Sequence, residues 1–319
     1  MTRYAYHDLL PPQAAMLDDV LAGLARTPKR VAPKYFYDAR GCELFDAICA
    51  LPEYYPTRTE LAIMTAQAPA MAAALAGDCA LIEIGCGNSA KSQRLLEALQ
   101  PKAFVAVDIA EEQLRASCDA LSRGFPRMQT IALRADFEQA VDLAAACLPA
   151  AQRRVLYFPG STIGNFTPAA ARDFLAHWAP LLGAGGRALI GVDLIKDAAR
   201  LDAAYNDAAG VTAAFNLNLL TRFNRELGAD FDCDAFRHRA FYDAAAGRIE
   251  MHLEATRAQT VTMGARRIEF AAGESMLTEI SCKYSIAGFE QLARDAGYAT
   301  LKCWADAGDQ FAVFLLGLD

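Results

Sequence analysis

The sequence predicts an α/β fold with a mostly parallel sheet covered by helices on both faces, together with a second, α+β domain. Short apolar runs alternate with helical segments from about residue 80 to 195, and this alternation is typical of a parallel sheet. The alternation breaks between about 196 and 275 and returns from about 286. The break indicates an insertion or a second subdomain.

The expected strands of the parallel sheet are apolar runs that end in a glycine, an acid or a loop. In chain order they are ALIEIG (80–85), AFVAVDI (103–109), TIALRADF (130–137), the start of RVLYFPGSTIGNF (154–166) and RALIGVDLI (187–195). Helices are expected between them at 89–99, 111–125 and 169–182. After a further helix, IAGFEQLARDAGY, the last segments predict a hairpin around Ala307 and Gly308 that could add an antiparallel edge strand.

The other segments are expected outside this sheet. The long segment from 196 is helical in pattern, and RHRAFYD and RIEMHLEAT after it are strand-like. MLTEISCKYS (276–285) is a further strand. The first 60 residues are helical and loop-like in pattern, with no signal for a parallel strand.

Composition excludes several classes of protein. With 31 Lys and Arg against 38 Asp and Glu, the net charge is −7, which disfavours nucleic-acid and anionic-membrane partners. No apolar run approaches the roughly 20 residues that span a bilayer, and MTRYAYHDLL lacks the apolar stretch of a signal peptide. Nine cysteines without a CxxC pair predict reduced thiols in a cytoplasm and no metal site.

The most informative short stretch is ALIEIGCGNSAKS, a strand, a glycine-rich turn and the start of a helix. Gly85, Gly87 and Ala90 match the GxGxx(G/A) fingerprint of nucleotide-type cofactor loops, and Asp108 ends the next strand near the distance expected for a ribose-binding acid. Glu83 lies two residues before the first glycine. This E-x-G-x-G pattern resembles motif I of class I S-adenosylmethionine-dependent methyltransferases, in which no phosphate is bound and the acid could lie near the methionine ammonium.

A third acid follows the next strand. Asp136 and Phe137 fit an adenine site, with a carboxylate for the amino group and an aromatic ring for the base. The alternative for the whole region is a structural strand–turn–helix corner. Three acids at three successive strand ends disfavour that alternative.

Several longer stretches resemble the histidine N-alpha-methyltransferase family of ergothioneine biosynthesis, from about residue 30 to the C-terminus. They are PKYFYDARG (33–41), LPEYYPTRTE (51–60), LIEIGCGNSAKS, PGSTIGNFTP (159–168), DLIKDAARL, DAAYNDAAGVTAAFN (202–216), RELGADFD and MLTEISCKYS. The resemblance implies a Rossmann-like class I methyltransferase domain, to which we assign 60–195 and 286–319. It implies a substrate-binding domain built from 1–59 and 196–285. We expect a monomer that binds S-adenosylmethionine and a small-molecule substrate.

The resemblance also implies roles for individual residues. Tyr54, Asn165 and Tyr205 would hold the backbone groups of the amino acid, with Tyr54 and Asn165 as the catalytic candidates. Met251 would line the ring pocket, and Glu279 and Ser281 would bind the imidazole. The cofactor-binding residues would be Tyr37, Glu83, Gly85, Gly87, Lys91, Asp108, Asp136 and Phe137.

Physical chemistry supports this assignment for the strand MLTEISCKYS. Side chains alternate along a strand, so Glu279 and Ser281 share one face with Leu277 and Lys283. Imidazole offers a donor and an acceptor on opposite edges, which a carboxylate and a hydroxyl two residues apart can meet. The alternative for this face is the solvent-exposed side of a half-buried strand.

Simpler roles are open to several of these residues. Asn165 could cap the helix that starts near Thr167, Met251 could be ordinary core, and Lys91 and Arg58 suit surface or positioning charges better than catalysts. The activity could instead be methylation of another aromatic amino acid such as tryptophan. A third hypothesis is a non-catalytic sensor of the cofactor or of an amino acid.

Overall fold

The chain folds into two compact units. The computed structural model describes residues 4–10, 13–75, 78–87, 90–138, 148 and 153–318. Unit 1 comprises Met1–Leu10, Pro56–Ile195 and Cys282–Asp319, and unit 2 comprises Pro11–Tyr55 and Lys196–Ser281. Each unit has an apolar core of its own. No helix within the described ranges is long and apolar enough to cross a membrane.

Unit 1 is built on an eight-stranded sheet, counted over the described residues, with the order β1-β5-β4-β3-β6-β7-β14-β13. Its strands are β1 (Ala5–Asp8), β3 (Cys79–Ile84), β4 (Ala103–Asp108), β5 (Gln129–Arg134), β6 (Arg153–Phe158), β7 (Arg187–Asp193), β13 (Ala299–Ala305) and β14 (Phe311–Gly317). The strands from β1 to β7 pair in parallel, whereas β14 pairs antiparallel with both β7 and β13. The five predicted strands and the terminal hairpin are therefore confirmed.

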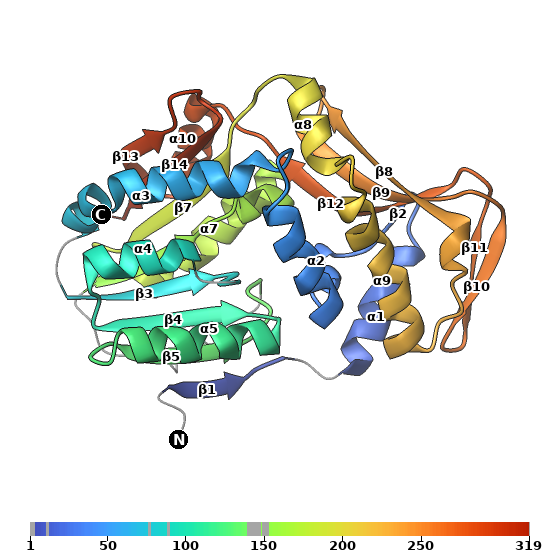
Figure 1. Ribbon diagram of the computed structural model, residues 1–319, viewed down its shortest axis with the longest axis horizontal. Coiled ribbons are helices and arrows are strands. Elements are labelled where there is room, and N and C mark those ends of the chain that lie inside the picture. The colour runs from blue at the N-terminus through green and yellow to red at the C-terminus, as the bar shows by residue number, and fades with distance from the viewer. Residues whose placement is uncertain are drawn as a thin grey trace. The chain divides into compact units, whose positions relative to one another are not determined.

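Helices cover both faces of this sheet. Figure 1 shows α3 (Tyr55–Leu75), α4 (Ala90–Leu99) and α5 (Glu111–Gly124) on one face and α7 (Pro168–Leu182) on the other. α10 (Ile286–Asp295) packs with α7 and β13. Every side chain of β3 and β4 is buried, as expected for central strands of a sheet with helices on both faces.

The order of the strands places the functional loops. The chain runs outward from β3 through β4 to β5, and then returns to the other side of β3 with β6 and β7. The loops after β3 and β6 therefore diverge at one point at the carboxyl edge of the sheet. Ligands of open α/β sheets bind at such a reversal of strand order.

The prediction that the first 60 residues hold no parallel strand was wrong. Residues 5–8, AYHD, form β1, which pairs in parallel with β5 at the edge of the sheet of unit 1. This segment therefore does not belong to the domain to which we assigned 1–59. A strand of four residues with two polar side chains and no fully buried position shows no apolar alternation, so its sequence carries no strand signal.

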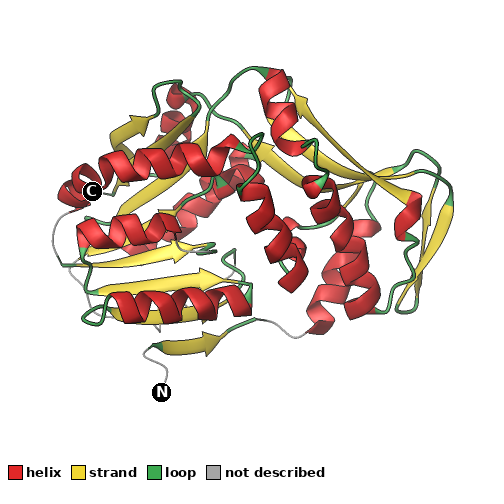
Figure 2. Ribbon diagram, viewed as in Figure 1, coloured by secondary structure: helices red, strands yellow, loops and turns green. Residues whose placement is uncertain are grey.

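In its described part, unit 2 combines a four-stranded sheet, in the order β2-β12-β9-β8, with a separate hairpin and helices. Figure 2 shows these strands and helices by colour. The strands are β2 (Lys29–Arg30), β8 (Phe236–Asp243), β9 (Arg248–Ala255), β10 (Gln259–Met263), β11 (Arg266–Phe270) and β12 (Ser275–Cys282), whose last residue is counted with unit 1. The helices are α1 (Gln13–Leu24), η1 (Pro33–Phe36), α2 (Ala39–Cys49), α8 (Ala198–Tyr205), α9 (Val211–Leu227) and η3 (Cys233–Ala235). The predicted strands at 237–243 and 248–256 are confirmed as β8 and β9, and MLTEISCKYS lies on β12.

Candidate active site

The glycine-rich turn follows β3, as its sequence predicts. Gly85 and Gly87 have φ angles of +68° and +48°, which glycine adopts at little cost. A Cβ added to Gly85 would meet nothing within 4 Å, so open space lies next to the turn. A ligand can therefore approach this backbone closely. The packing predicted for the Ala90 side chain lies outside the described residues.

Asp108 at the end of β4 holds this turn. Its carboxylate accepts hydrogen bonds from the N–H of Gly87 at 3.2 Å and of Ala110 at 2.9 Å. Ser117 adds a hydrogen bond to the carbonyl of Gly87 at 2.6 Å. Burial raises the pKa of Asp108 above its ordinary value, although the hydrogen bonds from backbone N–H groups oppose the shift. The position suits a ribose ligand, because the acid lies against the turn that the ligand must approach.

Glu83 in β3 is a buried acid whose partner comes from α4. The hydroxyl of Ser92 lies 2.6 and 2.5 Å from its two carboxyl oxygens. Burial raises the pKa of Glu83 to about 8, while the Ser92 hydroxyl and the Lys91 ammonium oppose this shift. Burial therefore favours the protonated form of the Glu83 carboxyl. A positive group brought nearby would lower this pKa and favour the carboxylate.

Asp136 and Phe137 directly follow β5, where an adenine site was predicted. Asp136 is buried, and its carboxylate accepts a hydrogen bond from the N–H of Glu138 at 3.1 Å. The half-buried ring of Phe137 packs edge-on against Phe158 and Phe166, with centroids 5.7 and 6.3 Å apart. The ring is thereby fixed beside the carboxyl end of β6.

Taken together, the described residues fit S-adenosylmethionine. An open glycine turn follows β3, and buried acids lie in β3, at the end of β4 and just after β5. Their order across the sheet is the one in which the methionine, ribose and adenine parts of the cofactor are predicted to bind. Within the described residues there is also no group of three His, Cys, Asp or Glu side chains that could hold a metal ion.

Asn165 is the last residue of η2 (Thr162–Asn165), the turn that follows β6. The alternative that Asn165 caps the next helix is wrong, because Thr167 is the N-cap of α7 and accepts from the N–H of Ala170 at 3.3 Å. The turn packs tightly. A Cβ on Gly164 would lie 2.9 Å from the carbonyl oxygen of Cys282, the residue after Ser281.

A buried ion pair lies near this turn and carries no signal in the sequence. The Lys283 ammonium is 2.8 Å from the Asp193 carboxylate, and each side chain is only 1% exposed. The N–H of Asp193 also donates to the hydroxyl of Ser161 at 2.9 Å. Lys283 and Asp193 are 90 positions apart in the sequence, so only the fold brings them together. The pair ties the carboxyl end of β7 to the segment after β12.

In unit 2, the structure gathers several of the residues predicted to bind substrate. The rings of Tyr54 and Tyr205 meet edge to face, with centroids 6.2 Å apart. The pKa of Tyr54 lies well above its ordinary value because of burial, with smaller contributions from the nearby Tyr205, Glu279 and Tyr37. Tyr54 is therefore a protonated phenol at neutral pH and can donate a hydrogen bond.

The backbone of Tyr205 is held by a histidine that the sequence did not single out. Nε2 of His238 lies 2.9 Å from the Tyr205 carbonyl oxygen, which can only accept, so Nε2 carries the proton. Nδ1 then accepts from the side-chain amide of Asn216 at 2.9 Å. Burial lowers the pKa of His238. A neutral His238 thus links α9, β8 and the end of α8.

The strand β12 carries Glu279 and Ser281 as predicted. On this face Ser281 is buried, whereas Leu277 and Glu279 are half-buried. The face is therefore partly covered, and most of all at Ser281. Thr278, on the other face, is fully buried and donates to the Met251 carbonyl at 3.0 Å. Met251 itself belongs to the apolar core of unit 2, and its contact with a substrate ring stays a prediction.

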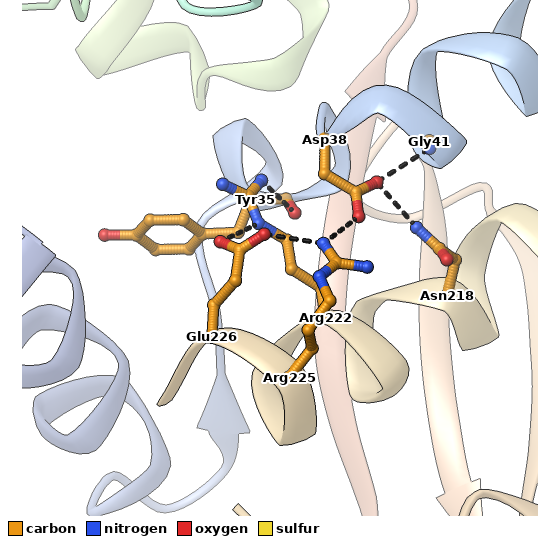
Figure 3. Close-up of polar contacts among 7 residues, drawn as sticks. All are labelled: Tyr35, Asp38, Gly41, Asn218, Arg222, Arg225 and Glu226. Atoms are coloured by element: carbon orange, nitrogen blue, oxygen red, sulfur yellow. Dashed lines mark hydrogen bonds and ion pairs between the residues drawn. The ribbon is translucent and has the colours of Figure 1, made fainter. Parts of the chain in front are cut away.

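Tyr37 directly follows η1. Figure 3 shows a polar network around the nearby residues Tyr35 and Asp38. The carboxylate of Asp38 caps α2 by accepting from the N–H of Gly41 at 2.7 Å, and it also accepts from Asn218 at 2.8 Å and Arg225 at 2.6 Å. Arg222 donates to the carbonyl of Tyr35 at 2.9 Å. The backbone is thus fixed on both sides of Tyr37, whose ring packs against Phe45 and Phe215.

The fold and the cofactor residues define the class of protein first. A parallel sheet with this strand order, an antiparallel last pair and a glycine turn after β3 is a class I S-adenosylmethionine-dependent methyltransferase fold. Residues 16–318 match the model of the histidine-specific, S-adenosylmethionine-dependent methyltransferases. The chain belongs to that family.

Relatives agree with this assignment. The chain is 44% identical over 307 residues to the histidine N-alpha-methyltransferase of Mycolicibacterium smegmatis, covering 94% of each chain. It is 43% identical to the histidine N-alpha-methyltransferase of Mycobacterium tuberculosis over the same shares. It is 30% identical to ergothioneine biosynthesis protein 1 of Neurospora crassa, with 91% of this chain aligned to 33% of that protein.

Replacing Asp38 by Asn should change how the stability of unit 2 depends on pH. Burial alone would raise the pKa of Asp38, but the hydrogen bonds from Arg225, Gly41 and Asn218 outweigh it and leave the pKa below its ordinary value. The lowered pKa stabilises the fold above about pH 4, and this contribution is lost as the pH falls through the folded-state value. Thermal melts between pH 7 and pH 2 should therefore show a shallower acid loss for Asp38→Asn than for the wild type.

The matched control for this prediction is Asp18→Asn, a change of an exposed carboxylate on α1 of the same unit. The control should follow the acid profile of the wild type. If Asp38→Asn does so as well, the network around the Tyr37 loop does not depend on the charge of Asp38.

Proposed function

We propose that this chain transfers methyl groups from S-adenosylmethionine to the α-amino group of L-histidine. The product would be the trimethylated betaine, hercynine, and the reaction would be the first step of ergothioneine biosynthesis. The match of residues 16–318 to the histidine-specific family carries this proposal. The names of the two mycobacterial relatives support the α-amino group as the acceptor.

We assign the cofactor to unit 1 and histidine recognition mainly to unit 2. In unit 1, the glycine turn, the acids and Phe137 would hold the cofactor, with Lys91 as a positioning charge. In unit 2, Tyr54 and Tyr205 would bind the backbone groups of histidine. In unit 1, Asn165 keeps its predicted role toward the same groups. The imidazole would meet Glu279, Ser281 and Met251, and Tyr37 would serve the cofactor. The full set of cofactor residues is Tyr37, Glu83, Gly85, Gly87, Lys91, Asp108, Asp136 and Phe137.

The chemistry asks the protein for alignment more than for a nucleophile. The bound cofactor supplies a methyl group already activated on a sulfonium. The task of the chain is to orient the amine for in-line attack, and orientation alone can supply most of the lowering of the barrier. The attacking amine must be neutral, and exclusion of water by the surrounding side chains favours its neutral form.

The protonation of the Tyr54 phenol decides which role this residue can take in methyl transfer. Its raised pKa keeps the phenol protonated, so Tyr54 would act as a hydrogen-bond donor and not as the base. Its ring would also favour, through cation–π contact, the positive charge that accumulates as methyl groups are added. We propose that the enzyme is a cytoplasmic monomer that binds neither nucleic acid nor membranes.

Mass spectrometry of single amino acids incubated with the protein and S-adenosylmethionine tests the proposal directly. The panel is histidine, tryptophan, tyrosine and phenylalanine. We expect successive gains of one methyl mass on histidine alone, because a hydrogen-bonding site leaves its own polar groups unpaired against rings that lack a matching donor and acceptor.

Two results would contradict the proposal in different ways. Methylation of tryptophan or tyrosine in place of histidine would keep the cofactor and reassign the substrate. Cofactor binding without turnover on any member of the panel would favour a sensor.

Glu279→Gln should weaken histidine recognition while leaving cofactor binding intact. Loss of one charge-assisted hydrogen bond to the ring should raise the KM for histidine about 10- to 100-fold. The affinity for S-adenosylhomocysteine, measured by calorimetry, should change less than about twofold, because one hydrogen bond outside the cofactor site is lost.

The matched control is Glu269→Gln, an exposed strand residue on β11. This control should leave the KM for histidine and the affinity for S-adenosylhomocysteine unchanged. An unchanged KM for histidine in Glu279→Gln would remove Glu279 from the site.

A further inference from the structure

A buried carboxylate to which the sequence motifs assign no role lies at the reversal point of the sheet. Glu60 on α3 is fully buried. Its carboxylate accepts from the N–H of Gly160, at 2.9 and 3.1 Å to its two oxygens, and from the Lys91 ammonium at 2.5 Å. Sequence reasoning singled out Lys91 and the neighbouring Arg58, but gave Glu60 no role.

The surrounding backbone leaves room for this carboxylate. A Cβ on Gly191 in β7 would lie 2.2 Å from Oε1 of Glu60, so no other residue fits there without moving the acid. A Cβ on Gly160 would lie 3.5 Å from the Lys91 ammonium. Buried ion pairs are a weak source of stability, and apolar side chains of similar volume often do as well. A role in ligand binding gives a better account of the pair.

The position of the pair tells which part of a ligand it would meet. Lys91 lies in the first turn of α4, just after the glycine turn of β3, and Gly160 follows β6. The predicted adenine and ribose residues follow β5 and β4, on the opposite side of β3 from β6. A ligand laid across the strands in the order β5, β4, β3 therefore brings its methionine end toward Lys91 and Gly160.

We propose that Glu60 is a positioning residue that orients the Lys91 ammonium toward the carboxylate of the methionine end of S-adenosylmethionine. The ammonium has three N–H donors, and Glu60 accepts from one of them while also fixing the loop after β6. The Lys91 side chain is 19% exposed, whereas that of Glu60 is not exposed at all. Lys91 can thus reach a ligand and Glu60 acts through it. The inference rests on the proposed role of Lys91 in cofactor binding.

A double-mutant cycle by calorimetry tests this inference. The four proteins are the wild type, Glu60→Gln, Lys91→Met and the double variant, each titrated with S-adenosylhomocysteine. Glu60→Gln places an amide where two donors converge, so it should weaken binding about tenfold. If Glu60 acts through Lys91, the same change should cost less than about twofold in the Lys91→Met background.

A truncated ligand separates positioning from a general structural effect. 5′-Methylthioadenosine keeps adenine and ribose but lacks the methionine carboxylate, so Glu60→Gln should change its affinity less than about twofold. The matched control is Glu97→Gln, which removes an exposed carboxylate paired with Arg94 on the same helix, α4. It should leave both affinities unchanged. Glu60→Asp keeps the charge but withdraws it by one methylene, so its affinity for S-adenosylhomocysteine should lie between those of the wild type and Glu60→Gln. This variant replaces Glu60→Gln in the test if Glu60→Gln does not fold.

Three results would overturn the inference. The effects of Glu60→Gln and Lys91→Met on the binding free energy could be additive, or Glu60→Gln could leave the affinity for S-adenosylhomocysteine unchanged. Glu60→Gln could also lower the affinities for S-adenosylhomocysteine and 5′-methylthioadenosine by the same factor. These measurements need no histidine. A wild type that binds S-adenosylhomocysteine but fails to methylate histidine would refute the proposed function and leave the Glu60 test standing.

Discussion

Parallel pairing of β3 with β4 on one side and β6 on the other is the constraint on which the cofactor site depends. It brings the carboxyl ends of these strands to one edge of the sheet, and the chain leaves that edge in opposite directions after β3 and β6. The glycine turn, Asp108 and the loop at Gly160 are then neighbours, although they are separated widely in the sequence. The chemistry of the site is a consequence of strand order more than of any local motif.

Buried charge is the second feature of this edge. Glu60, Glu83 and Asp108 are all buried there, and each is handled differently. Glu60 is paired with an ammonium, Glu83 has its pKa raised to about 8, and Asp108 accepts from two backbone N–H groups. Three anions this close would repel one another at low dielectric. The pairing of Glu60 with Lys91 and the raised pKa of Glu83 both reduce this repulsion.

The sequence predicted what local pattern encodes and missed what only tertiary packing creates. The central strands, the glycine turn and the terminal hairpin follow from apolar runs and turn residues, and the structure confirms them. β1 was not predicted because a short polar edge strand shows no alternation of apolar and polar residues.

The candidate site divides along the same line. Glu83 and Asp108 stand in a recognisable motif and could be named in advance. Glu60, His238 and the Lys283–Asp193 pair are defined by partners 22 to 100 positions away. Glu60 and Lys283 lie in stretches that carry the family resemblance, but a stretch does not show which distant residue its side chains will meet. A lysine and an acid become a buried pair only when the fold removes both from water.

In unit 2, several hydrogen bonds hold the backbone next to the residues that are predicted to bind the ligands. His238 holds the carbonyl of Tyr205, and Thr278, next to Glu279, holds the carbonyl of Met251. Asp38, next to Tyr37, fixes its loop through the first turn of α2. In each case the contact falls on the backbone or on the adjacent side chain, and not on the side chain predicted to bind. These contacts fix the backbone near the predicted residues, and the ring contacts of Tyr37 with Phe215 and of Tyr205 with Tyr54 then fix how those two rings are turned.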